Sequence, residues 1–264
     1  MELRPPVYPS DITDEQWDLI KSFLPAKKNR GRPRTTELRT VVNAIFYVVR
    51  TVCQWRYLPN DFPPWQTVYD YFRKWKMADM WEKLNQRLNE KIRVKEGREK
   101  RPSAGVIDSQ SVKTAYGGED RGYDAGKKTK GRKRHLLVDT MGLVWNAVVH
   151  TADLQDRDGA ECLLAITRDS ICKRLRKIWV DGGYRGRFVE WTRKWFKVEV
   201  EVVKKEHPNL FTVLPRRWVV ERTFGWFNGF RRLSKDYEIL SRTSETMIYI
   251  TMVQLLSKRL TTSR

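Results

Sequence analysis

The sequence predicts a mixed α/β protein, in which an all-α, helix-turn-helix-like domain precedes a larger domain built on a mixed sheet. Three features lead to this class. Apolar residues recur at helical spacing in residues 1–100, short β-rich runs open residues 101–264, and helical patterns then alternate with strands. The charged stretch 96–102 marks the expected boundary, which gives one domain at 1–100 and another at 101–264.

Four helices are expected in the first domain. The first begins at a capping box, Thr13-Asp14-Glu15-Gln16, and ends near Phe23. The others are expected at residues 36–52, 65–76 and 81–95. Because a turn-rich stretch separates the second helix from the third, the arrangement is typical of a helix-turn-helix-like module.

The charge of the chain indicates its partner. There are 52 Lys and Arg residues against 32 Asp and Glu, a formal net charge of +20 with a pI near 10.0. Solubility alone needs a net charge of only about 2 to 8. So positive a field attracts polyanions, of which nucleic acid is the commonest, and we expect double-stranded DNA.

Two segments of the first domain are candidate DNA contacts. The linker 27–34 resembles an AT-hook and offers Arg30, Arg32 and Arg34, although a plain solvated linker would have the same composition. The third helix carries polar residues opposite its aromatic face, namely Gln66, Thr67, Arg73 and Lys74. These would enter a major groove, or else form the charged surface of an ordinary helical bundle.

The second domain is expected to contain five strands and three helices. The strands are predicted at residues 105–108, 135–139, 143–150, 178–181 and 198–203, and the helices at 158–173, 187–195 and 218–230. Between the first two strands lies a glycine-punctuated basic run that includes Lys128, Arg132 and Lys133. We expect this run to track DNA phosphates, and a solvated charge cluster is the alternative.

Three carboxylates are candidates for metal-assisted chemistry. Asp108 and Asp181 each end an apolar run, and Glu221 lies in a segment with helical spacing. The chain has only three His and three Cys, without metal-ligand spacing, and a hard cation such as Mg²⁺ prefers oxygen ligands. We therefore expect two divalent ions, Mg²⁺ or Mn²⁺, at these acids.

Other acids are expected to be structural. Asp139 precedes a hairpin and fits a turn residue. Asp153, Asp156 and Asp158 lie where a strand passes into a helix, a position where Asp commonly caps the helix.

Several long motifs then resemble one family. The segments 105–114, 130–140, 152–160 and 217–226, with 58–59, 62–65 and 67–72 in the first domain, are similar to the bacterial DDE transposases of the insertion-sequence-five family. The resemblance implies a ribonuclease H-like catalytic domain whose triad is Asp108, Asp181 and Glu221. The short spacing of the last two acids excludes the β-rich insertion that some related transposases carry.

The resemblance departs from a wider pattern around the third acid, Tyr-x2-Arg-x3-Glu-x6-Lys. Arg217 and Glu221 match, whereas Leu214 and Asn228 stand at the Tyr and Lys positions. We expect Arg217 to position a phosphate one turn before Glu221, with a surface ion pair between the two as the alternative. Further DNA contacts are expected from Arg222, Arg231 and Arg232.

The expected function is an insertion-sequence transposase that binds terminal inverted repeats, cleaves at the element ends with divalent metal, and joins the 3′ ends to target DNA. A homodimer would hold the paired ends. A stand-alone nuclease of the same fold and a catalytically silent DNA-binding regulator are the alternatives. Without an expected membrane helix or signal peptide, the protein should be cytoplasmic and associated with the bacterial nucleoid.

Overall fold

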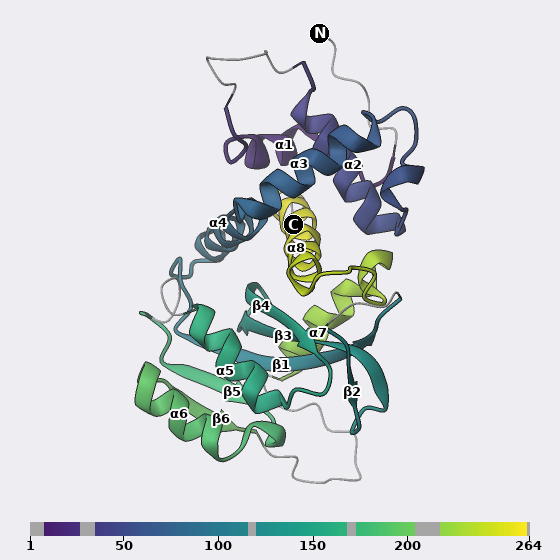
Figure 1. Cartoon of the computed structure of the whole chain (residues 1–264). Coiled ribbons are helices and arrows are strands. Elements are labelled where there is room, and N and C mark those ends of the chain that lie inside the picture. Colours follow the sequence, from purple (N-terminus) through teal and green to yellow (C-terminus); the bar gives the residue numbers. More distant parts are fainter. Residues whose placement is uncertain (1–7, 27–34, 116–119, 168–172, 204–216, 263–264) are drawn as a thin grey trace. The chain divides into compact units, whose positions relative to one another are not determined.

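The computed structural model describes residues 8–26, 35–115, 120–167, 173–203 and 217–262. The chain divides into two compact units (Figure 1). Unit 1 is Met1–Leu88, Phe230–Arg232 and Thr246–Arg264, and unit 2 is Asn89–Gly229 and Leu233–Glu245. This division differs from the linear boundary expected at residue 100, because the end of the chain returns to the helical unit.

Unit 1 is helical, as predicted. Its elements are α1 (Asp14–Lys21), α2 (Leu38–Thr51), the short 3-10 helix η1 (Trp55–Tyr57), α3 (Trp65–Met77) and the first half of α4 (Met80–Lys95). The capping box is present, since Thr13 and Gln16 each accept from the other's backbone amide. Of the predicted apolar face of α3, Val68, Phe72 and Trp75 are buried, whereas Tyr69 is exposed.

The last helix, α8 (Ser241–Thr261), is not predicted by the sequence, and its residues from Thr246 onward belong to unit 1. Consecutive residues of α8 are buried, among them Ile248, Ile250 and Thr251. A helix buried on all sides has no alternation between an apolar and a polar face. The periodicity that revealed the other helices is therefore absent here.

Unit 2 is built on a six-stranded mixed sheet. Its strands are β1 (Ala104–Lys113), β2 (Gly122–Asp124), β3 (Thr129–Asp139), β4 (Val144–Thr151), β5 (Lys177–Val180) and β6 (Glu199–Val202). The order is β2-β3-β1-β5-β6, with β4 also paired to β3. The β1–β5 and β5–β6 pairs are parallel and the others are antiparallel. The predicted mixed α/β class is therefore confirmed.

Two strands are longer than predicted. β1 does not end at Asp108 but continues to Lys113, and β3 begins at Thr129, within the basic run. The two strands pair without interruption from Gly105 opposite Asp139 to Lys113 opposite Gly131. The sequence does not reveal the full length of these strands, because many of their side chains are polar. A strand covered on both faces can carry polar side chains when each has a hydrogen-bond partner.

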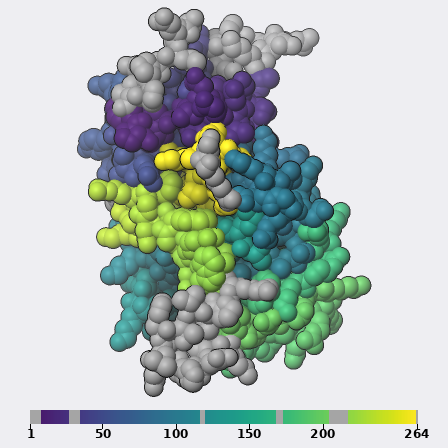
Figure 2. Space-filling model, turned by 180° about the vertical axis from the view of Figure 1, so that it is seen from behind, coloured from purple at the N-terminus to yellow at the C-terminus, as the bar shows by residue number. Residues whose placement is uncertain are grey.

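Helices cover both faces of the sheet. α5 (Asp156–Thr167) and α6 (Arg187–Phe196) lie in front of it in Figure 1, and α7 (Trp218–Phe227) packs against β1 and β3. The surface that contains α7 is seen in yellow-green from the back in Figure 2. Among the described helices, none is long and apolar enough to span a membrane.

The β3–β4 hairpin is anchored by Asp139, as its expected turn role required. One carboxylate oxygen, Oδ1, accepts the amides of Met141 and Leu143 at 2.8 and 3.1 Å. The other forms a 2.5 Å ion pair with Arg93 of α4, and both side chains are buried. A buried ion pair is costly to break, because removing one partner leaves an uncompensated charge.

We therefore expect Asp139→Ala to lower the free energy of unfolding by about 3–5 kcal/mol. Urea denaturation monitored by circular dichroism measures this change. The matched control is Glu199→Ala, which removes an exposed partner of Lys177 and should cost less than about 1 kcal/mol. Equal losses in the two variants would contradict the role of Asp139.

Candidate active site

Asp108 and Asp181 are brought together by the parallel pairing of β1 with β5. Val106 lies opposite Trp179 in this pair, and each aspartate follows two residues later. Residues two apart on a strand share a face, so the carboxylates reach the same level on one side of the sheet. Glu221 comes from the first turn of α7.

One arginine connects the three acids. The Nη2 atom of Arg217 lies 3.2 Å from Asp108 Oδ2, 3.7 Å from Asp181 Oδ2 and 3.8 Å from Glu221 Oε1. The side chains of Arg217 and Asp108 are largely buried, at 15% and 13% exposed, whereas Glu221 is 60% exposed. The ion pair with Glu221 that the sequence analysis considered is thus one of three contacts.

Backbone amides fix the other oxygen of each aspartate. The Ser109 amide donates to Asp108 Oδ1 at 2.7 Å. The Gly183 amide donates to Asp181 Oδ1 at 2.8 Å, because Asp181 caps the 3-10 turn η2 (Gly182–Tyr184). Each Oδ2 is therefore left pointing toward Arg217.

Burial and charge oppose each other at this site. Burial raises the pKa of Asp108, and the Arg217 guanidinium and the Ser109 amide only partly offset it. Burial lowers the pKa of Arg217, but Asp108, Asp181 and Glu221 outweigh it and leave that pKa raised. When all four groups are ionised, one guanidinium leaves two negative charges uncompensated.

The donor set suits a hard divalent cation, since three carboxylates from separate elements converge on one positive group. The described residues nevertheless contain no ready-made cluster of three or more His, Cys, Asp or Glu around a common point. The guanidinium occupies the place that the acids share. Binding of a cation among them would require Arg217 to move.

Two predicted DNA contacts are corrected by the structure. Arg132 and Lys133 lie inside unit 2, with side chains 1% and 6% exposed. Arg132 donates to the backbone carbonyls of Glu238 and Ile239, and Lys133 pairs with Asp156. Because β3 continues into the basic run, these side chains serve its packing and present no charge to DNA. Lys128 is exposed in the preceding turn.

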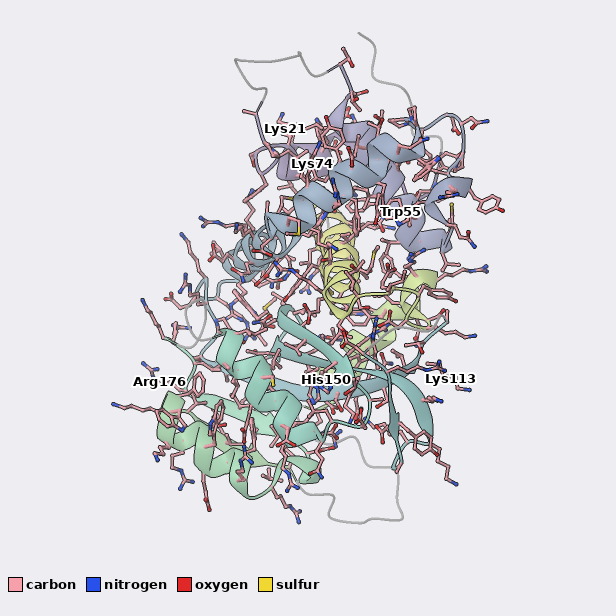
Figure 3. All side chains as sticks on the ribbon, viewed as in Figure 1. Lys21, Trp55, Lys74, Lys113, His150 and Arg176 are labelled. Atoms are coloured by element: carbon pink, nitrogen blue, oxygen red, sulfur yellow. The ribbon has the colours of Figure 1, made fainter. Side chains whose placement is uncertain are left out.

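The remaining candidates fall into three groups. On α3, Gln66, Arg73 and Lys74 are exposed and Thr67 is half-buried, with Lys74 labelled in Figure 3. Around α7, Arg231 is exposed, Arg232 is buried and donates to the Cys53 carbonyl, and Arg222 lies between the rings of Trp218 and Trp226. The linker residues Arg30, Arg32 and Arg34, like Leu214, lie outside the described residues.

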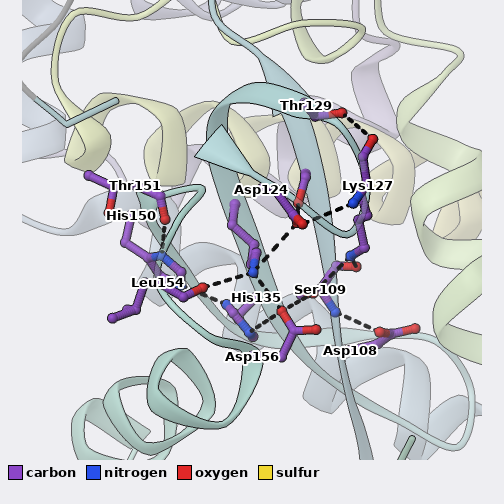
Figure 4. Close-up of polar contacts among 12 residues, drawn as sticks. Asp108, Ser109, Asp124, Lys127, Thr129, His135, His150, Thr151, Leu154 and Asp156 are labelled. Atoms are coloured by element: carbon purple, nitrogen blue, oxygen red, sulfur yellow. Dashed lines mark hydrogen bonds and ion pairs between the residues drawn. The ribbon is translucent and has the colours of Figure 1, made fainter. Parts of the chain in front are cut away.

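A polar cluster that the sequence does not predict lies on the face of β1 opposite Asp108, shown in Figure 4. Its central members are Ser109, Lys133, His135, His150 and Asp156. His135 and His150 stack and share a 2.8 Å hydrogen bond between His135 Nδ1 and His150 Nε2. The sequence predicts only a helix-capping role for Asp156. The sequence signal for this cluster is the alternation of Lys133 and His135 with Arg132 along β3. Polar residues on both faces of a strand require hydrogen-bond partners on both faces.

A mixed sheet that brings three carboxylates together is typical of metal-dependent enzymes that act on phosphodiesters. Comparison with family models makes this specific. The model "Transposase DDE domain" matches residues 99–256, and "Putative transposase of IS4/5 family" matches residues 12–85. The chain belongs to the DDE transposase family, and the resemblance noted from the motifs is confirmed.

Individual relatives are more distant. The "Insertion element IS402 uncharacterized 16.2 kDa protein" of Burkholderia cepacia is 29% identical over 117 residues, which cover 42% of this chain and 78% of that protein. The crystal structure of the Mos1 strand transfer complex aligns over 89% of this chain and 79% of the other, with 14% identity and a TM-score of 0.31.

Because of the pair formed by His135 and His150, we expect the stability of the folded protein to depend on pH. Burial lowers the pKa of His135 to about 3, and burial also lowers that of His150. Below a pH of about 6.5 the unfolded chain binds protons that the folded protein does not, so the free energy of unfolding falls as pH decreases. Urea denaturation between pH 8 and 5 should show this loss. It should be smaller in His135→Gln, and an equal slope in both proteins would contradict the assignment.

Proposed function

We propose that the protein is an insertion-sequence transposase that binds the terminal inverted repeats of its element, cleaves at the element ends, and joins the freed 3′ ends to target DNA. The observation that carries the proposal is the convergence of Asp108, Asp181 and Glu221 on a single guanidinium nitrogen. Membership of the DDE transposase family supplies the substrate class.

In this proposal, the three acids hold two Mg²⁺ ions, for which Mn²⁺ can substitute. Asp108 and Asp181 would be shared ligands, and Glu221 would hold the second ion. When bound, such ions activate the attacking oxygen and stabilise the leaving oxygen of a phosphodiester. The Ser109 and Gly183 amides keep one oxygen of each aspartate fixed, so the other remains directed at the common centre.

Arg217 has two roles in this scheme. Without a cation it offsets part of the repulsion among the three acids. With a cation held by the three acids, Arg217 would be available to a DNA phosphate, because its planar donors suit phosphate oxygens. This retains the phosphate-positioning role expected from the sequence and adds a counter-ion role.

Unit 1 would recognise the element ends through α3. Its exposed Gln66, Arg73 and Lys74 lie opposite a buried aromatic and apolar face, as in a helix that enters a major groove. A homodimer would hold two ends together. As a bacterial enzyme acting on DNA, it would work in the cytoplasm, at the nucleoid.

Two alternatives give different products. A stand-alone nuclease of the same fold would cleave without joining, and a silent regulator would bind ends without cleaving. The presence of all three acids, directed at one point, favours an active enzyme over the regulator.

Asp108→Asn tests the triad. The substitution keeps the shape of the side chain but removes a charge, and we expect end cleavage to fall by about 10²–10³-fold or more. Labelled end DNA and a target plasmid, incubated with Mg²⁺ or Mn²⁺, report cleavage and joining separately. The matched control is Asp158→Asn, a change of the same kind in α5, which should leave both reactions unchanged.

Each outcome selects one hypothesis. Undiminished activity of Asp108→Asn would refute the triad. Cleavage without joining by the wild-type protein would favour the nuclease, and end binding without either reaction would favour the regulator.

Arg73→Ala with Lys74→Ala tests the role of α3. Each lost phosphate contact should reduce the slope of log affinity against log salt by about 0.9. Fluorescence anisotropy with end DNA at several salt concentrations measures this slope. Lys21→Ala, which removes a similar exposed cation from α1 of the same unit, is the control (Figure 3). A slope unchanged in the double variant would exclude α3 as the DNA-contacting helix.

A further inference from the structure

A buried ion pair lies on the face of β1 opposite the three acids. Lys133 Nζ is 2.9 Å from Asp156 Oδ1, and the lysine side chain is only 6% exposed. The same ammonium donates to the Leu154 carbonyl at 2.8 Å and lies 3.6 Å from Asp124 Oδ2. An ammonium group has three protons, so these three acceptors leave it one favourable orientation.

Asp156 is connected to Asp108 through Ser109. The Ser109 hydroxyl donates to Asp156 Oδ1 at 2.9 Å, while the Ser109 amide donates to Asp108 Oδ1 at 2.7 Å. Neighbouring residues of a strand point to opposite faces, so Ser109 reaches Asp156 on the α5 face of the sheet while Asp108 reaches Arg217 on the α7 face. Ser109 thus contacts Asp156 with its side chain and Asp108 with its backbone amide, as Figure 4 shows.

The same carboxylate lies beside the turn that holds Asp181. A Cβ added to Gly183 would be 3.7 Å from Asp156 Oδ2 and 3.1 Å from Asp181 Oδ1. The Gly183 amide is the donor that fixes Asp181. The Asp156 carboxylate therefore lies next to the Gly183 turn, and a larger residue at position 183 would crowd Asp181 Oδ1.

The histidine pair sets the place of α5. Gly159, one turn after Asp156, packs directly on His135 and His150, and a Cβ there would collide with both rings. The edge of Tyr184, from the turn after Asp181, also meets the His135 ring, with centroids 6.2 Å apart. These contacts fix the helix, and with it Asp156, relative to β3 and to the Asp181 turn.

We propose that Asp156, held by Lys133, is a positioning residue for Asp108, acting on it through Ser109. The inference rests on the proposed function for what Asp108 does, but its geometry stands without it. Asp156 acts from the α5 face of the sheet, because its Oδ1 already accepts from Lys133 and Ser109 on that side.

Three variants test this in the full chain. Asp156→Asn keeps the shape of the side chain but removes the charge that pairs with Lys133, Ser109→Ala removes the link to Asp108, and a double variant combines them. Asp158→Asn, two residues along the same helix, is the control. Outer residues that orient metal ligands typically contribute 10–100-fold to activity, so we expect a single-turnover cleavage rate about 10–100-fold lower in Asp156→Asn, with unchanged end-DNA affinity.

The double variant separates positioning from direct action. If Asp156 acts through Ser109, its substitution should add little to the loss already caused by Ser109→Ala. If the two losses multiply instead, Asp156 acts on substrate or metal by another route, and the proposal is wrong.

Amide hydrogen exchange gives a readout that needs no activity. In Asp156→Asn, the Ser109 amide should exchange about tenfold faster, because the residue that carries it is held less firmly, while Asp158→Asn should match the wild type. Unchanged exchange at this amide would overturn the proposal. If Asp156→Asn shows this faster exchange but the wild-type protein neither cleaves nor joins DNA, the result would support positioning and refute the proposed function.

Discussion

The arrangement of unit 2 depends on the contact of one guanidinium with three carboxylates. Parallel pairing of β1 with β5 places Asp108 and Asp181 at the same level, and α7 adds Glu221. Acids this close repel one another, and burial makes the repulsion more costly. Arg217 offsets only part of it. A site with uncompensated negative charge is well suited to a divalent cation, because the cation would reduce the repulsion among the carboxylates.

The two faces of the central strands have separate tasks. On β1, Asp108 faces the other two acids and Ser109 faces the cluster beneath α5. On β3, Lys133 and His135 face α5, whereas Arg132 and Arg134 bind backbone carbonyls of the segment before α8. Buried charged groups are tolerated when they are paired and hydrogen-bonded. The contacts on the α5 face therefore hold the strands that carry Asp108 on the other face.

The basicity of the chain is consequently a poor measure of its DNA-binding surface. Arg132, Lys133 and Arg134 contribute to the net charge of +20 but are buried. The cations available to DNA among the described residues include those of α3, such as Arg73 and Lys74, and Lys128 beside the sheet. Charge composition predicts a polyanionic partner, but the location of any contacts depends on which cations the fold has already used.

The sequence by itself determined the helices with one apolar face, the mixed α/β class, the family, and the three acids as candidates, because these follow from local periodicity and from motifs. Only the tertiary structure decided that β1 continues past Asp108, that the basic run becomes the buried strand β3, that α8 returns to the helical unit, and that Asp156 accepts a hydrogen bond from Ser109. Each of these depends on partners distant in the chain. A buried Lys and a polar strand look like a surface loop in the sequence, because the partners of their polar groups are distant in the chain. A helix covered on all sides shows no apolar periodicity.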